Sequence, residues 1–175
     1  TVTLREARGK NRVFLEKLFG VRFALVMPFA RHLETQASLL VQFDARLEQE
    51  RYFLELAAGF WLPSETNRHA SLGGFVAHLG GSYYLLHDSC SPYIGLGVSP
   101  RVFLGEYQGA GLAVNAHVGV MFMRESSTRL YAEVRADQNL IKAQSNAYDY
   151  TSALEPSRGQ DVLPTVLSLA VGLGF

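Results

Sequence analysis

The chain has 175 residues, enough for one domain with a substantial core, and it gives no reason to expect a second domain. Its 16 Lys and Arg residues balance 16 Asp and Glu residues, so the sequence lacks the basic surface that a nucleic-acid partner requires. Hydrophobic residues make up 48% of the chain and charged residues only 18%, yet no apolar run approaches the roughly 20 residues of a membrane-spanning helix.

Residues 1–19 precede the regular pattern and are expected to form an N-terminal extension or the tail of an upstream periplasmic segment. From residue 20 onward, apolar residues recur at every second position, which is the period of a β-strand and not of a helix. In the first of these segments Phe23 and Leu25 share one face, while Arg22 lies on the other. Four such segments fill the first half of the chain, at residues 20–29, 39–48, 52–62 and 75–86.

The second half continues the same alternation, with segments at residues 93–104, 112–122, 130–137 and 163–175. The total is about eight strands of about ten residues, a length that crosses a bilayer when the strand is tilted. We therefore expect the apolar faces to contact lipid and the polar faces to line the interior of a barrel. A soluble lipocalin-like barrel is the alternative fold, and it would reverse both faces.

The connections between the predicted strands alternate in length. The first, third and seventh are long or polar, whereas the second, fourth and sixth are short turns. This alternation is typical of an outer-membrane barrel with both termini in the periplasm. The fifth connection, residues 105–109, is shorter than the alternation requires. Pro28, Pro100 and Pro164 lie inside predicted strands and are expected toward the extracellular ends, where a missing N–H donor is best tolerated.

Two segments carry a resemblance to a known family. Residues 92–98 read Pro-Tyr-Ile-Gly-Leu-Gly-Val, and the chain ends with Leu-Ala-Val-Gly-Leu-Gly-Phe. Together with the alternating strands, they resemble the small eight-stranded outer-membrane barrels of the OmpA-domain and OmpX type over roughly residues 20–175. The resemblance implies an all-β fold, an eight-stranded antiparallel up-and-down transmembrane β-barrel formed by residues 20–175, and a location in the bacterial outer membrane.

The same resemblance implies partners for the chain. Outer-membrane lipid and lipopolysaccharide would surround the barrel, and Phe175 would be the signal read by the barrel-assembly machinery. An upstream periplasmic domain or an envelope complex is a further candidate partner, and no cofactor is expected. Aromatic residues are expected at both membrane boundaries. The expected periplasmic set is Tyr52, Tyr83, Phe122 and Phe175, and the expected outer set is Phe29 and Phe60.

Charged residues occur on the predicted inner face of several strands. They are Arg22, Asp44, Arg46, Glu55, Arg101, Glu133, Arg135 and Asp137. A barrel of about eight strands is only wide enough to hold its own side chains, so buried charges must pair or bear a steep desolvation cost. We therefore expect an interior salt-bridge network and a lumen that is closed to solute. A proton relay, an ion path or an active site is the alternative role for these residues.

A lipid-modifying enzyme would require a nucleophile and an activating base that meet in space. The candidates are the predicted inner-face residues His78 and His117, and the run His87-Asp88-Ser89. Neighbours in one tight turn cannot by themselves form such a site, so a turn is the favoured interpretation of that run. A two-histidine metal site would lack a third ligand at suitable spacing, so no metal site is predicted.

The sequence favours a non-enzymatic barrel that serves as a structural or anchoring element or as a surface-recognition protein. A narrow channel and a lipid-modifying enzyme remain the alternatives. Any recognition is assigned to the loop at residues 142–161, because loops can vary while the barrel stays fixed. The aromatic and charged residues of this loop that are suited to an interface are Tyr148, Asp149, Tyr150 and Arg158.

Overall fold

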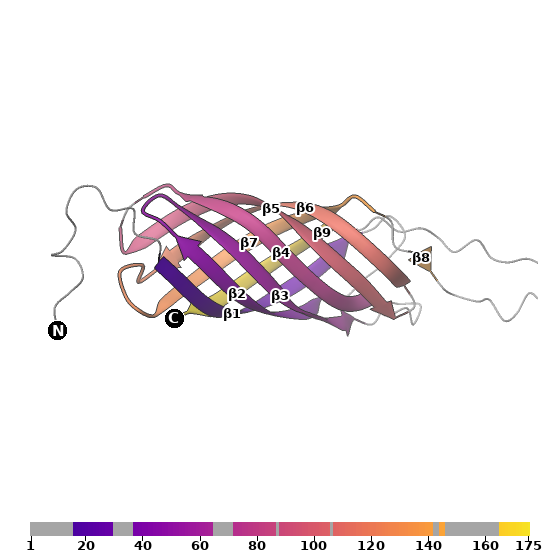
Figure 1. The fold of residues 1–175 in the computed structure, drawn as a ribbon. Helices are drawn as coiled ribbons and strands as arrows, with labels where there is room; N and C mark the ends of the chain where they lie inside the picture. Colours follow the sequence, from indigo (N-terminus) through magenta and orange to yellow (C-terminus); the bar gives the residue numbers. More distant parts are fainter. Residues whose placement is uncertain are drawn as a thin grey trace, which may run out of the picture.

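The chain folds into a closed antiparallel β-barrel, seen in a computed structural model that describes residues 16–29, 37–64, 72–86, 88–105, 107–141, 144–145 and 165–175 (Figure 1). Eight long strands form the barrel. They are β1 (Glu16–Phe29), β2 (Ser38–Glu48), β3 (Tyr52–Ser64), β4 (Leu72–Tyr84), β5 (Cys90–Gly105), β6 (Tyr107–Phe122), β7 (Arg129–Asn139) and β9 (Thr165–Gly174). A two-residue strand, β8 (Gln144–Ser145), pairs with the start of β6. The predicted all-β, eight-stranded barrel is confirmed.

The barrel closes where the first long strand meets the last. β1 pairs with β2 on one side and with β9 on the other, and every other long strand pairs antiparallel with its two neighbours. At the end of this seam, Phe19 and Phe175 exchange two backbone hydrogen bonds of 3.0 and 2.8 Å. No helix in the described part of the chain is long and apolar enough to cross a membrane.

The two faces of the strands differ as the alternation predicts. On β1, Phe23 is 55% exposed on the outside, whereas its neighbour Arg22 is 1% exposed in the lumen. The same in-and-out pattern runs along β2, β7 and β9. Apolar side chains therefore cover the outside and charged side chains fill the inside, which rules out the lipocalin-like arrangement.

The ends of the barrel differ in their connections. The turns between β2 and β3, β4 and β5, and β6 and β7 lie together with the C-terminus, on the left in Figure 1, and we call this the short-turn end. The fifth connection is short because β5 and β6, at 16 residues each, extend toward the opposite end as a long hairpin. Residues 105–109 were expected to form the connecting loop, but the described residues among them continue the strands.

The start of the first strand also differs from expectation, and the prolines have different positions in the ladders. β1 begins at Glu16, four residues before the boundary placed at residue 20, because the alternation already starts with inward Leu18 and outward Phe19. The backbone pairing between β4 and β5 has a gap after the Val76–Arg101 pair and resumes at the Leu79–Val98 pair. Pro100 lies in this gap and has no N–H to donate. Pro28 lies in β1 opposite Val166, and Pro164 lies outside the described residues.

Candidate functional site

Glu55 on β3 is the centre of an ionic network in the middle of the lumen. Its Oε1 accepts hydrogen bonds from Arg22 Nη2 at 2.5 Å and Arg135 Nη2 at 3.1 Å. Its Oε2 lies 2.8 Å from Nη2 of Arg46, the residue that pairs with it across the β2–β3 ladder. One carboxylate thus meets guanidinium groups from three other strands.

Glu133 on β7 forms the second centre of this network. Its Oε1 accepts hydrogen bonds from Nε and Nη2 of Arg135, at 3.0 and 2.7 Å, and lies 3.4 Å from Arg22 Nη1. Its Oε2 accepts a hydrogen bond from the Tyr93 hydroxyl at 3.0 Å. Asp44 completes the network, since it lies 3.1 Å from Arg46 Nε and accepts a hydrogen bond from Tyr131.

The structure places all eight charged residues named from the sequence inside the lumen, and each is at most 6% exposed. Six of them form the central network. The other two, Arg101 and Asp137, form a separate ion pair with an N–O distance of 3.1 Å. A cavity of about 30 Å³ lies between the network and this pair, large enough for about two water molecules. Four positive and four negative groups therefore share a largely filled interior.

A second ionic cluster, at the short-turn end, was not predicted from the sequence. Arg129 on β7 donates to Glu48 on β2 and, at 2.6 Å, to Glu16 at the start of β1. Arg124 in the β6–β7 turn donates to Glu48 Oε1 at 2.8 Å and lies 3.8 Å above the centre of the Tyr84 ring. Arg129 follows the inward parity of β7, and this was the signal that could have identified it.

Large rings of the lumen lie against glycines on neighbouring strands. A side chain at Gly172 would collide with the ring of Tyr131, and one at Gly119 would collide with Tyr93. His117 and His78 occupy the corresponding spaces beside Gly95 and Gly97. These glycines therefore make room for rings to cross the inner wall of a narrow barrel.

Apolar residues close the lumen on both sides of the charges. The cluster at the short-turn end consists of Phe53, Tyr84, Tyr93, Met121 and Tyr131. The cluster toward the opposite end consists of Ala24, Val26, Trp61, Phe103, Val166 and Ala170. The Trp61 indole is also fixed, because its Nε1 donates a hydrogen bond to Ser38 Oγ. The lumen thus holds packed apolar and aromatic side chains on both sides of the ionic network.

The two inner histidines lie side by side with polar partners. Ser82 Oγ is 2.7 Å from His117 Nε2, and Asn115 Oδ1 is 3.4 Å from His117 Nδ1. His78 Nδ1 lies 3.2 Å from Asn115 Nδ2, and the two imidazole ring centres are 5.8 Å apart. The contacts from Ser82 to His117 and from His117 to Asn115 resemble the arrangement of an activated serine nucleophile. Sequence spacing did not predict this arrangement, because Ser82 lies on β4 whereas Asn115 and His117 lie on β6.

The other candidate residues are dispersed. Asp88 and Ser89 lie exposed in the β4–β5 turn, whereas His87 falls outside the described residues. No group of three or more His, Cys, Asp or Glu residues in the described ranges could hold a metal ion. Phe175 is 62% exposed at the short-turn end. The candidate recognition residues all lie outside the described ranges: Tyr148, Asp149, Tyr150 and Arg158.

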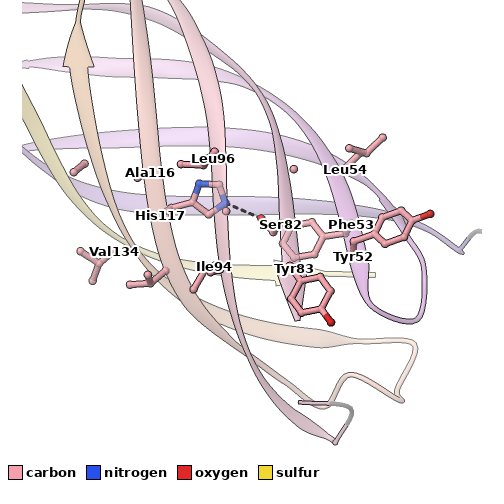
Figure 2. Close-up of a pocket in the computed structure, with 14 residues that line it drawn as sticks. Tyr52, Phe53, Leu54, Ser82, Tyr83, Ile94, Leu96, Ala116, His117 and Val134 are labelled. Atoms are coloured by element: carbon pink, nitrogen blue, oxygen red, sulfur yellow. Dashed lines mark hydrogen bonds between the residues drawn. The ribbon is translucent and has the colours of Figure 1, made fainter. Parts of the chain in front are cut away.

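A groove of about 780 Å³ is cut into the outer wall across β3 to β7 (Figure 2). Its floor follows one row of the sheet, in which Gly81 lies between Leu54 and Leu96 and is followed by Ala116 and Ala136. Longer side chains border this row on the side toward the short-turn end. They are Tyr52, Tyr83, Ile94, Val118 and Val134. The side chains of Ser82 and His117 back the groove from the inner side of the sheet, where both are buried.

Comparison with known proteins identifies the fold. No protein-family model and no curated protein matches the sequence. Among solved structures, Neisserial surface protein A superposes with a TM-score of 0.69 at 9% identity, over 90% of this chain and 95% of that one. The outer membrane protein OprG from Pseudomonas aeruginosa gives 0.65 at 17% identity, over 92% and 97% of the two chains. The outer membrane protein AlkL, determined in DMPC lipid bilayers, gives 0.58 at 16% identity, over 96% and 94%.

This fold is that of the small eight-stranded outer-membrane barrels. The exterior agrees with it, since large apolar side chains are exposed on all eight long strands. An apolar belt of this kind is stable only in hydrocarbon. The fold and the apolar belt together place the chain in the bacterial outer membrane.

Proposed function

We propose that this outer-membrane barrel is a non-enzymatic anchoring or surface-recognition protein whose lumen does not conduct solute. The observation that carries the proposal is the network around Glu55, where Arg22, Arg46 and Arg135 converge from three strands. The two apolar clusters lie on either side of this network. An ion would have to displace paired buried charges as well as packed rings.

Recording from the purified protein in planar bilayers tests this part of the proposal. We expect no stable conductance steps, whereas a large porin reconstituted in the same bilayers should give them. Stable, large steps from the wild-type barrel would overturn the closed lumen and favour the narrow channel. A Glu55→Gln variant serves as an internal comparison, because it weakens the central network without removing side-chain volume.

An anchoring role is supported by how the barrel holds its first strand. Glu16 begins β1 at the short-turn end, which is the periplasmic side if the longer connections face outward. Arg129 binds Glu16 and Glu48 together, so the point at which the preceding chain joins the barrel is fixed. An upstream periplasmic segment or domain would thus be held at a defined position. Pull-down of envelope proteins with and without residues 1–15 tests this role.

A recognition role is supported at the opposite end. The β5–β6 hairpin extends there, and β8 pairs with its second strand. The loop residues Tyr148, Asp149, Tyr150 and Arg158 remain our candidates for contacting a partner. A partner that bound equally well after residues 146–161 were shortened would exclude this loop.

The Ser82–His117 pair is the observation that favours an enzyme as the second candidate. Both side chains are buried on the inner side of the sheet, at 6% and 4% exposed. The groove that lipid can enter lies on the other side of the same sheet. We therefore assign Ser82 a structural role and expect neither the wild-type protein nor a Ser82→Ala variant to hydrolyse phospholipid or lipid A. Hydrolysis by the wild type that Ser82→Ala abolished would establish the enzyme instead.

A further inference from the structure

We propose that the groove in the outer wall is a binding site for one phospholipid from the leaflet at the short-turn end. Its two acyl chains would lie on either side of Leu96, one at Gly81 and the other at Ala116 and Ala136, and the phosphate would lie at the rim near Tyr52 and Tyr83. This site is independent of the lumen and of the proposed anchoring role.

The groove exists because small residues share a single row of the sheet. Gly81, Ala116 and Ala136 leave the backbone uncovered, while Leu54 and Leu96 stand on either side of Gly81. Leu96 is 70% exposed and rises from the same row between Gly81 and Ala116, so it divides the floor into two hollows. The resulting volume of about 780 Å³ is in the range of sites that enclose small organic ligands.

The position of the groove determines which occupants can reach it. It lies on the lipid-facing side of β3 to β7, so a ligand must approach from within the hydrocarbon of the membrane. A second copy of the barrel would present a convex wall and would touch the ridges before it reached the floor. Flexible acyl chains can enter the narrow hollows on either side of Leu96 and make close contacts with their walls.

The rim supplies groups that suit a phosphate. Tyr52 and Tyr83 are direct partners across the β3–β4 ladder, and their half-exposed side chains stand next to each other at the short-turn end (Figure 2). Tyrosines at this depth place a hydroxyl donor at the headgroup level. Arg51, an exposed cation in the turn, directly precedes Tyr52 in the chain. A phosphodiester at this rim would have both a charge partner and hydrogen-bond donors.

Native mass spectrometry of the purified protein with palmitoyl-oleoyl phosphatidylglycerol tests the site. The key variant is Gly81→Leu, because a Cβ at this position meets only Leu54 Cδ2 at 3.4 Å and Phe53 O at 4.0 Å, so the new side chain fills the groove without a backbone clash. Ala58→Leu is the matched control, since Ala58 is also exposed on the outer face but does not line the groove. The mobility difference between heated and unheated samples in detergent gels verifies that each variant is folded.

We expect the wild type and Ala58→Leu to retain one lipid. The affinity of Gly81→Leu for the lipid should be about tenfold lower, because the new side chain removes roughly ten close carbon contacts. Arg51→Gln should lower retention of phosphatidylglycerol more than retention of diacylglycerol, which has no phosphate. Equal retention by Gly81→Leu and the wild type would overturn the proposal. The mass of the wild type could instead correspond to two protein chains, and that of Gly81→Leu to one chain. This result would overturn the lipid proposal and identify a second copy of the barrel as the occupant of the groove.

Discussion

The ring of Tyr131 on β7 occupies the space that a side chain at Gly172 of β9 would take. From there its hydroxyl donates a hydrogen bond to Asp44 of β2 at 2.8 Å and lies 3.3 Å from Arg22 Nε of β1. Tyr131 therefore crosses the inner face of the last strand and binds the first two. The seam between β1 and β9 is held by side chains as well as by its backbone ladder.

Gly172→Ala should destabilise the barrel by about 1–3 kcal/mol, because the added methyl group forces the Tyr131 ring out of its place. Denaturant unfolding in detergent measures the change. Combining it with Tyr131→Ala should cost less than the sum of the two single variants, since the ring that clashes is then absent. Strict additivity would show that the two residues do not share this space.

Glu55→Ala should cost about 3–5 kcal/mol in the free energy of unfolding, because it leaves three buried guanidinium groups without their shared partner. The destabilisation by Glu133→Ala and by Arg135→Ala should fall in the same range. It should be smaller where water can reach the charge that has lost its partner. Glu50→Ala, whose side chain is exposed in the β2–β3 turn, should change stability by less than about 0.5 kcal/mol. A Glu55→Ala barrel as stable as this control would show that the network contributes little.

Leu56→Arg should destabilise the barrel by about 2–4 kcal/mol, as expected for a cation near the middle of the lipid-facing wall. Leu85→Arg is its control at the short-turn end, where the cost should be about 0–1 kcal/mol. Both leucines are more than half exposed, so the depth in the membrane is the main difference between the two sites. Equal effects in reconstituted vesicles would contradict the membrane placement.

Deletion of Phe175 should lower the fraction of assembled barrel in the outer membrane, because it removes the aromatic side chain and both hydrogen bonds to Phe19. Phe175→Ala keeps those backbone bonds and so separates recognition of the side chain from closure of the seam. Ser127→Ala in the exposed β6–β7 turn is the control. Gel mobility of unheated membranes reports assembly, and wild-type levels for the deletion would argue against Phe175 as the assembly signal.

Much of the fold was predictable because the outer face meets one uniform environment. Alternation with a period of two assigned Phe23 outward and Arg22 inward without any knowledge of pairing. The partners of the charges could not be predicted in the same way. Arg22 pairs across its ladders with Gln42 and Gly172, yet its ion pairs are with Glu55 and Glu133 two strands away on either side. Such contacts depend on strand stagger and side-chain reach, which no local pattern encodes.

The ends of the strands were harder to predict for a different reason. Glycine and polar residues between Gly105 and Gly109 favour a loop locally, but β5 and β6 pair continuously from Cys90–Phe122 to Phe103–Gly109 and so carry the strands into this segment. The Arg124 and Arg129 cluster was missed because charges near turns usually face water. Here Arg124 from the β6–β7 turn and Arg129 from β7 both bind Glu48, which is buried at 4% exposed.

The convergence of three arginines on Glu55 has a consequence for how this barrel can diverge. A lineage that lost the Glu55 carboxylate alone would pass through an intermediate in which Arg22, Arg46 and Arg135 share only Glu133 and Asp44. Selection would remove this intermediate, with its one uncompensated interior cation, unless an arginine changed as well. Substitutions of interior charged residues are therefore expected to occur in compensating pairs. The net charge of the lumen would then stay the same while the positions of the charged residues change. The lipid-facing positions are free of this constraint, since one aliphatic side chain replaces another there without needing a partner.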